Sequence, residues 1–234
     1  MHNASVAINV WDRWIRLFHW GLVIAVLVSF YTTKTSGAPF LFPIETHAQA
    51  GYAILGLLIF RWCWGLVGSV YARFKTFLYP LPHTINYANN LVKRQPHAYA
   101  SHNPLGGWMV VVFLLSLSFQ AISGLFLSDD IFFQAPLYGL FSEEVAGLLR
   151  TLHQLNSDLL IILIGLHLVG VIVHRLQGEP LLAAMLTGTK RFRQPPIDAR
   201  SEPLSTATLR LRALAALFIG AGIALWLWYF GNSY

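Results

Sequence analysis

The stretch Leu152–His174 reads LHQLNSDLLIILIGLHLVGVIVH. It is long and apolar enough to cross a hydrocarbon layer as one helix, because a spanning helix needs about 20 mostly apolar residues. Two histidines within it, His153 and His167, are 14 residues apart. At about 100° per residue they lie about 40° apart around the helix and about 21 Å apart along its axis. The stretch therefore predicts a membrane helix that carries two imidazoles on one face, at two depths.

Four more stretches predict spanning helices, and they extend over residues 15–33, 47–67, 108–127 and 213–230. The whole chain is 56% hydrophobic and only 11% charged, whereas soluble domains are roughly a quarter charged. The composition thus excludes a soluble globule, and it also excludes disorder, which requires low hydrophobicity and high charge. Because four spans follow the first, we interpret that first span as a retained helix and not a cleaved signal peptide.

Lysine and arginine residues are distributed unevenly between the two sides of this arrangement. With a cytoplasmic N-terminus, the inner segments hold 14 of the 16 basic residues and the outer segments keep only Lys34 and Arg150. Cytoplasmic loops carry the excess of basic residues, so we expect a multi-pass inner-membrane protein with a periplasmic C-terminus. The net charge of +6 is then an orientation signal, and the sequence gives no reason to expect a nucleic-acid partner.

The chain contains one cysteine, Cys63, so a disulfide framework, a thiolate iron–sulfur cluster and a thioether-linked haem are excluded. Four histidines lie within the predicted spans at two depths. His19 and His167 form an inner pair, and His47 and His153 form an outer pair, each from two different helices. Two imidazoles across an interhelical gap are what a six-coordinate haem iron requires. Zinc fits less well, because it prefers four ligands at one depth.

Several other polar residues are candidates for supporting roles. Arg16, one turn before His19, is the first candidate for binding a haem propionate, and Arg61, deep in the second span, is the other. His174 is a less favoured alternative to His167 as a ligand. Asp158 either caps the outer site or belongs to a proton route. Four further histidines are interpreted as solvated: His2, His83, His97 and His102.

The connecting segments differ in character. Residues 131–150 carry apolar side chains at helical spacing, which indicates either an amphipathic segment on the outer surface or a loop that folds back on the bundle. Gln194–Ser205 is rich in proline, serine and charge, which indicates a linker. We therefore divide the chain into a bundle with two haems (1–193), a cytoplasmic linker (194–212) and an extra C-terminal spanning helix (213–234).

Several motifs resemble the bacterial cytochrome b561 family, in particular its nickel–iron hydrogenase b-type cytochromes. They are VWDRWIRLFHW at 10–20, HAQAGY at 47–52, the ending of the second span from Arg61 to Phe74, NPLG at 103–106, the His153–His167 spacing, and the Met185, Gly188 and Lys190 ending. The resemblance covers roughly residues 9–190. The fifth span lies outside the pattern.

The resemblance implies an all-α integral membrane protein whose four-helix bundle binds two b-type haems, with ligands at His19, His47, His153 and His167. It also implies electron exchange between the quinone pool and an outer redox partner, such as a hydrogenase or a c-type cytochrome. The alternative is an enzyme that itself oxidises a small reductant such as superoxide and passes the electrons to quinone.

Overall fold

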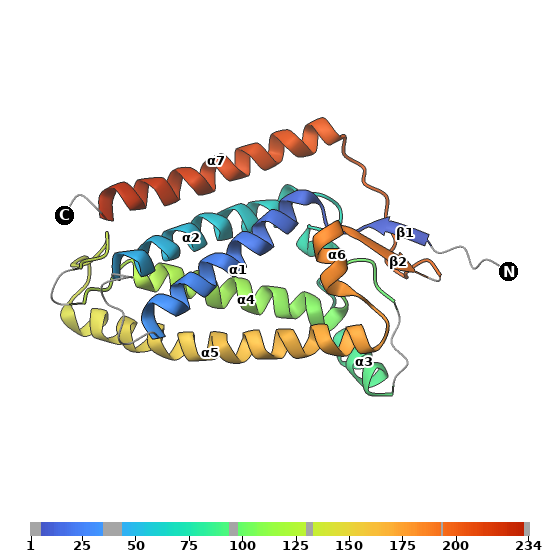
Figure 1. Cartoon of the computed structure of the whole chain (residues 1–234), viewed down its shortest axis with the longest axis horizontal. Coiled ribbons are helices and arrows are strands. Elements are labelled where there is room, and N and C mark those ends of the chain that lie inside the picture. The colour runs from blue at the N-terminus through green and yellow to red at the C-terminus, as the bar shows by residue number, and fades with distance from the viewer. Residues whose placement is uncertain (1–5, 35–43, 94–97, 130–132, 193, 232–234) are drawn as a thin grey trace. The chain divides into compact units, whose positions relative to one another are not determined.

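The computed structural model describes residues 6–34, 44–93, 98–129, 133–192 and 194–231, and Figure 1 shows their helices and strands. The α-helices of these residues are α1 (Arg13–Lys34), α2 (Ile44–Val67), α3 (Leu81–Val92), α4 (Pro104–Gly124), α5 (Glu143–Leu176), α6 (Leu181–Thr187) and α7 (Thr206–Gly231). A short 3-10 helix spans Phe74–Thr76, and the strands are β1 (Val6–Asn9) and β2 (Thr189–Phe192).

Five of these helices, α1, α2, α4, α5 and α7, are long and apolar enough to cross a membrane. Each corresponds to one predicted span, although α4 ends at Gly124, three residues before the predicted end of the third span, so the predicted number and order are confirmed. Within the 18-residue apolar stretch of each helix, the share of buried residues differs. It is 50% in α2, the largest of the five, and only 11% in α1 and in α5. Large apolar side chains therefore remain exposed along the other helices, as expected for surfaces that face lipid.

The segment 131–150 is not a separate surface helix. From Glu143 onward it is the beginning of α5, which continues without a break to Leu176. Before Glu143 the chain folds back on the end of α4, where Ala135 N donates to Leu127 O at 2.9 Å and Leu137 N donates to Leu125 O at 2.9 Å. The folded-back loop, the second of the two interpretations, thus describes the first part of the segment.

The helical fold is supplemented by elements that the sequence pattern does not reveal. Strand β1 pairs antiparallel with β2, with Val6 opposite Phe192 and Asn9 opposite Thr189 (Figure 1). Helices α3 and α6 are short and lie outside the spanning segments. The expected all-α class therefore holds except for this two-stranded sheet. The last helix begins at Thr206, so only residues 194–205 of the predicted linker lack helical structure among the residues described.

The chain forms two compact units, each built from three stretches. Unit 1 comprises Met1–Leu17, Cys63–Val112 and Gly165–Ala213, and unit 2 comprises Phe18–Trp62, Phe113–Ile164 and Leu214–Tyr234. Each unit therefore combines segments that are far apart in the sequence.

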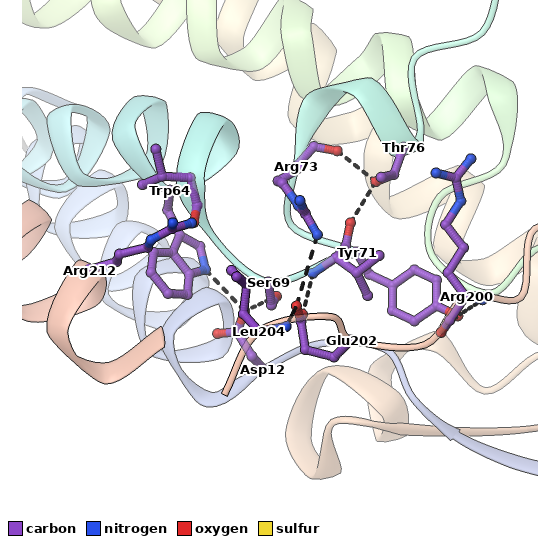
Figure 2. Close-up of polar contacts among 12 residues, drawn as sticks. Asp12, Trp64, Ser69, Tyr71, Arg73, Thr76, Arg200, Glu202, Leu204 and Arg212 are labelled. Atoms are coloured by element: carbon purple, nitrogen blue, oxygen red, sulfur yellow. Dashed lines mark hydrogen bonds and ion pairs between the residues drawn. The ribbon is translucent and has the colours of Figure 1, made fainter. Parts of the chain in front are cut away.

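In unit 1, the carboxylate of Asp12 joins the start of α1 to the end of α2. Oδ1 caps α1 by accepting hydrogen bonds from Trp14 N at 2.7 Å and Ile15 N at 2.9 Å. Oδ2 accepts hydrogen bonds from Trp64 Nε1 at 3.0 Å and from the Ser69 hydroxyl, as Figure 2 shows. Trp64 is completely buried. One side chain thus fixes the N-terminus of α1 against the residues where α2 ends.

In unit 2, α7 packs closely against α2 through two glycines. A Cβ added at Gly56 would lie 2.8 Å from the carbonyl oxygen of Gly220, and a Cβ added at Gly220 would overlap the carbonyl oxygen of Gly56. Small residues allow helix backbones to approach in this way. Towards the ends of the same helices, Tyr52 and Leu227 are buried in one apolar cluster. The fifth spanning helix is therefore packed against the bundle within unit 2.

This close approach predicts different effects for two alanine substitutions in α7. Gly220→Ala should lower the stability by about 1–3 kcal/mol, because the new methyl group forces two backbones apart. Gly222→Ala is the matched control, since a Cβ there meets no atom within 4 Å. It should be neutral or stabilise the helix by up to about 1 kcal/mol. Melting temperatures of both purified variants test the packing, and equal melting temperatures would contradict it.

Candidate metal centre

The predicted outer pair of histidines is brought together within unit 2. His47 lies in the first turn of α2 and His153 lies in the third turn of α5. Their ring centroids are 6.3 Å apart, with the ring planes at 75° to each other. Both residues are half-buried. The structure therefore places two imidazoles from different helices opposite one another, as the sequence spacing predicts.

The Nδ1 atom of each ring is held by a serine. His153 Nδ1 lies 2.9 Å from the Ser123 hydroxyl of α4. His47 Nδ1 lies 3.1 Å from the carbonyl oxygen of Ser29 in α1 and 3.2 Å from its hydroxyl. A hydrogen bond at one ring nitrogen orients the ring and determines which tautomer it adopts. Among the described residues, neither ring makes a hydrogen bond through Nε2, so Nε2 is the nitrogen available to a metal.

The separation of the two rings suits one metal ion between them. Metal–nitrogen bonds of about 2 Å on both sides place the two ligand nitrogens about 4 Å apart and the ring centres about 6 Å apart. The observed 6.3 Å agrees with this spacing. Gly51, one turn after His47, adds open space, because a Cβ there would meet no atom within 4 Å. The residues present thus fit a metal cofactor bound by two histidines.

The two predicted inner ligands, His19 and His167, belong to different units. His19 lies in the part of α1 that belongs to unit 2, half-buried, with the edge of its ring against Trp20 at 5.1 Å. His167 lies in the part of α5 that belongs to unit 1 and is exposed. A Cβ at neighbouring Gly165 or Gly170 would meet no atom within 4 Å. Their pairing stays a prediction from the sequence.

The two arginines proposed for propionates occupy different surroundings. Arg16 donates a hydrogen bond of 2.5 Å from Nη1 to the carbonyl oxygen of Leu186, near the end of α6. Its buried Nε has no hydrogen-bond partner among the described residues. Arg61 is almost completely buried in α2, with 3% of its surface exposed. Arg16 thus supports α6 through one nitrogen and retains Nε as a donor for another group.

Both ring nitrogens of His174 already have partners in unit 1. Nε2 lies 2.9 Å from the Asn103 side chain, and Nδ1 lies 3.1 Å from Glu179 Oε2. Burial by itself raises the pKa of Glu179, but the hydrogen bond with His174 and the charge of Lys190 outweigh it and lower that pKa. A ligand role for His174 would require one of these hydrogen bonds to break, so the geometry favours a structural role.

The histidines expected to be solvated have mixed surroundings. His83 is exposed, and its Nε2 lies 2.9 Å from the Tyr99 hydroxyl. His102 is half-buried, with Phe77 and Trp11 against its ring at 4.7 and 6.0 Å between centroids, so its solvated interpretation is wrong. Its aromatic neighbours come from distant parts of the sequence, which explains the error. His2 and His97 lie outside the described residues.

Sequence reasoning missed the polar side chains that support this centre. Ser29 and Ser123 hold the two histidines, and Asn156, one turn beyond His153, donates to Ser116 O at 3.0 Å and to Gln120 Oε1 at 2.7 Å. A polar residue within an apolar span costs free energy unless it has a partner, so its occurrence there was a usable signal.

The chain is similar to known proteins of one family. The family model described as Prokaryotic cytochrome b561 matches residues 10–188. A protein of Azotobacter vinelandii named "Probable Ni/Fe-hydrogenase B-type cytochrome subunit" is 27% identical over 231 residues, covering 84% of this chain and 93% of the relative. A protein of Azotobacter chroococcum mcd 1 with the same name is 26% identical with the same coverage. No solved structure matches the chain significantly.

The match to the family extends over more than half of the chain and includes α1, α2, α4 and α5, whereas α7 lies beyond it. It also includes His47 and His153, whose ring centroids are 6.3 Å apart in unit 2. The chain therefore belongs to the prokaryotic cytochrome b561 family, as a multi-pass membrane protein of electron transport that binds haem b.

Proposed function

We propose that the protein carries electrons across the bacterial inner membrane through two b haems, each bound by two histidines. His47 and His153 bind the outer haem, and His19 and His167 bind the inner one. The N-terminus is cytoplasmic and the C-terminus periplasmic, as the distribution of 14 inner and two outer basic residues favours. The electrons pass between the quinone pool and a redox partner at the periplasmic side.

The observation that carries this proposal is the arrangement of His47 and His153. Their ring centroids are 6.3 Å apart, and both Nδ1 atoms are engaged by serine residues. When bound, a haem b supplies a one-electron Fe(III)/Fe(II) couple. The protein's own contribution is to orient both imidazoles through the hydrogen bonds at Nδ1. The inner pair is supported by the sequence spacing and by the family.

Arg16 and Arg61 are proposed to bind haem propionates. A guanidinium forms strong hydrogen bonds with carboxylates, and it remains charged in apolar surroundings. Arg16 is the stronger candidate, because its Nε has no hydrogen-bond partner among the described residues while Nη1 is anchored on Leu186.

The periplasmic partner is proposed to be a hydrogenase-like enzyme or a c-type cytochrome. The two Azotobacter relatives carry names of hydrogenase cytochrome subunits, which supports the first choice. Acidic residues of the predicted outer side, among them Asp129, Glu143 and Glu144, favour a partner with a basic docking face.

Proteoliposomes test the proposed electron transfer. Ferricyanide is enclosed inside the vesicles and dithionite is added outside, so that electrons must cross the membrane. We expect vesicles with the protein to reduce the enclosed ferricyanide many-fold faster than vesicles without it. The His47→Ala variant should fall to the protein-free rate, whereas His83→Ala, an exposed histidine outside the spans, should retain the full rate. Equal rates with and without the protein would contradict the proposal.

The hydrogen bond between Ser123 and His153 predicts an effect on one haem potential. Donation from Nδ1–H to the serine oxygen makes the imidazole a stronger ligand and stabilises Fe(III). Ser123→Ala should therefore raise the midpoint potential of one haem by tens of millivolts, on the order of the net free energy of one hydrogen bond.

Redox titration of the purified variants measures this shift. The matched control is Ser118→Ala, on the same helix, because the hydroxyl of Ser118 accepts from Trp62 Nε1 at 3.2 Å and contacts neither histidine. The prediction fails if both haems keep their potentials in Ser123→Ala, or if Ser118→Ala shifts them equally.

A further inference from the structure

Unit 1 contains a cavity of about 450 Å³ between two segments that adjoin spanning helices. One segment, residues 70–76, follows the end of α2 at Val67, and the other, residues 199–203, precedes the start of α7 at Thr206. Figure 2 shows residues of both segments, including Arg73, Thr76 and Arg200. Neither the proposed haem ligands nor the proposed propionate residues line this cavity.

The walls of the cavity are positively charged. Arg73, Lys75 and Arg200 all line it, and Ser201 adds a hydroxyl group. Within the part of the chain that the structure describes, the Lys75 ammonium and the Arg200 guanidinium make no ion pair or hydrogen bond. The polar contacts of Arg200 with Tyr71 involve only its backbone. Two cations therefore remain available to a ligand.

Two carboxylates adjoin this group of cations, and both already accept hydrogen bonds from the backbone: Asp198 Oδ1 accepts one of 2.6 Å from Ala100 N. Glu202 Oε2 accepts a hydrogen bond of 2.5 Å from Val70 N, and Oε1 accepts one of 3.1 Å from Leu204 N. Its ion pair with Arg73 is long, at 3.9 Å from Nη2. The buried Nε of Arg73 has no hydrogen-bond partner among the described residues. Glu202 thus joins the two segments and leaves a surplus of positive charge in the cavity.

The cavity lies beside the ends of two helices that are long and apolar enough to span a membrane. It lies three residues beyond the end of α2 and three residues before the start of α7. Arg212, in the second turn of α7, donates a hydrogen bond of 3.0 Å to the carbonyl oxygen of Val67, so both helix ends are held together. Lipid phosphates lie immediately outside the ends of spanning helices.

We infer that this cavity binds the phosphate group of an anionic phospholipid. Cations near the membrane surface attract anionic lipids, and basic pockets beside spanning helices bind their headgroups. Arg73 and Arg200 provide planar donors for the phosphate oxygens, Lys75 provides a third charge, and Ser201 provides a hydroxyl donor. The bound lipid then links the end of α2 to the linker before α7.

Native mass spectrometry of the full-length protein in a neutral detergent tests this inference. The protein is titrated with phosphatidylglycerol, with phosphatidylcholine and with inorganic phosphate. We expect tight binding of phosphatidylglycerol only. The double variant Lys75→Gln/Arg200→Gln should bind it more than tenfold more weakly, and each single variant about fivefold more weakly, since each cation near the surface contributes about equally.

The matched control is Arg191→Gln/Arg210→Gln, which removes the same charge from two exposed arginines of unit 1 outside the cavity. It should bind phosphatidylglycerol as the unchanged protein does. If both double variants lose affinity equally, the attraction is a property of the net charge and the site is refuted. If inorganic phosphate binds as tightly as the lipid and displaces it, the cavity is a site for free phosphate, and the assignment to a lipid is overturned.

Discussion

An imidazole within a hydrocarbon layer needs partners for its ring nitrogens, and this requirement governs the arrangement of unit 2. A polar group without a partner costs several kcal/mol there, by order of magnitude. Ser29 and Ser123 satisfy Nδ1 of His47 and His153, and the two rings are left 6.3 Å apart. The proposed iron is the partner that would satisfy the second nitrogen of each ring. The serines therefore orient the histidines that the proposed site uses as ligands.

Such a site requires that its helices be fixed with little freedom. In unit 2, the glycine contact between α2 and α7 holds the helix that carries His47, so α7 supports the proposed outer haem site although it lies outside the family match. In unit 1, Asp12 holds the first turn of α1 through four hydrogen bonds, two of them from residues at the end of α2. Arg16 follows in the next turn and fixes the end of α6.

The spans were predictable because each is a long apolar segment, and hydropathy along a single segment is sufficient to identify it. The proximity of His47 to His153 was predictable, because the rise per residue of a helix gives the depth of each histidine in its span from its place in the sequence. Pairing of β1 with β2 was not, since it joins four-residue strands about 180 residues apart whose local patterns are weak. The surroundings of His102, and the Asp12 contacts with Trp64 and Ser69, likewise depend on residues that only the folded chain brings together.

The central claim is that His47 and His153 bind the same haem, and the haem content of variants tests it most directly. A pyridine haemochrome assay, combined with protein quantification, counts the b haems in each chain. The account predicts two haems in the unchanged protein and one in His47→Ala, in His153→Ala and in the double variant, because both residues serve one site. Two haems retained in either single variant, or none in the unchanged protein, would contradict it.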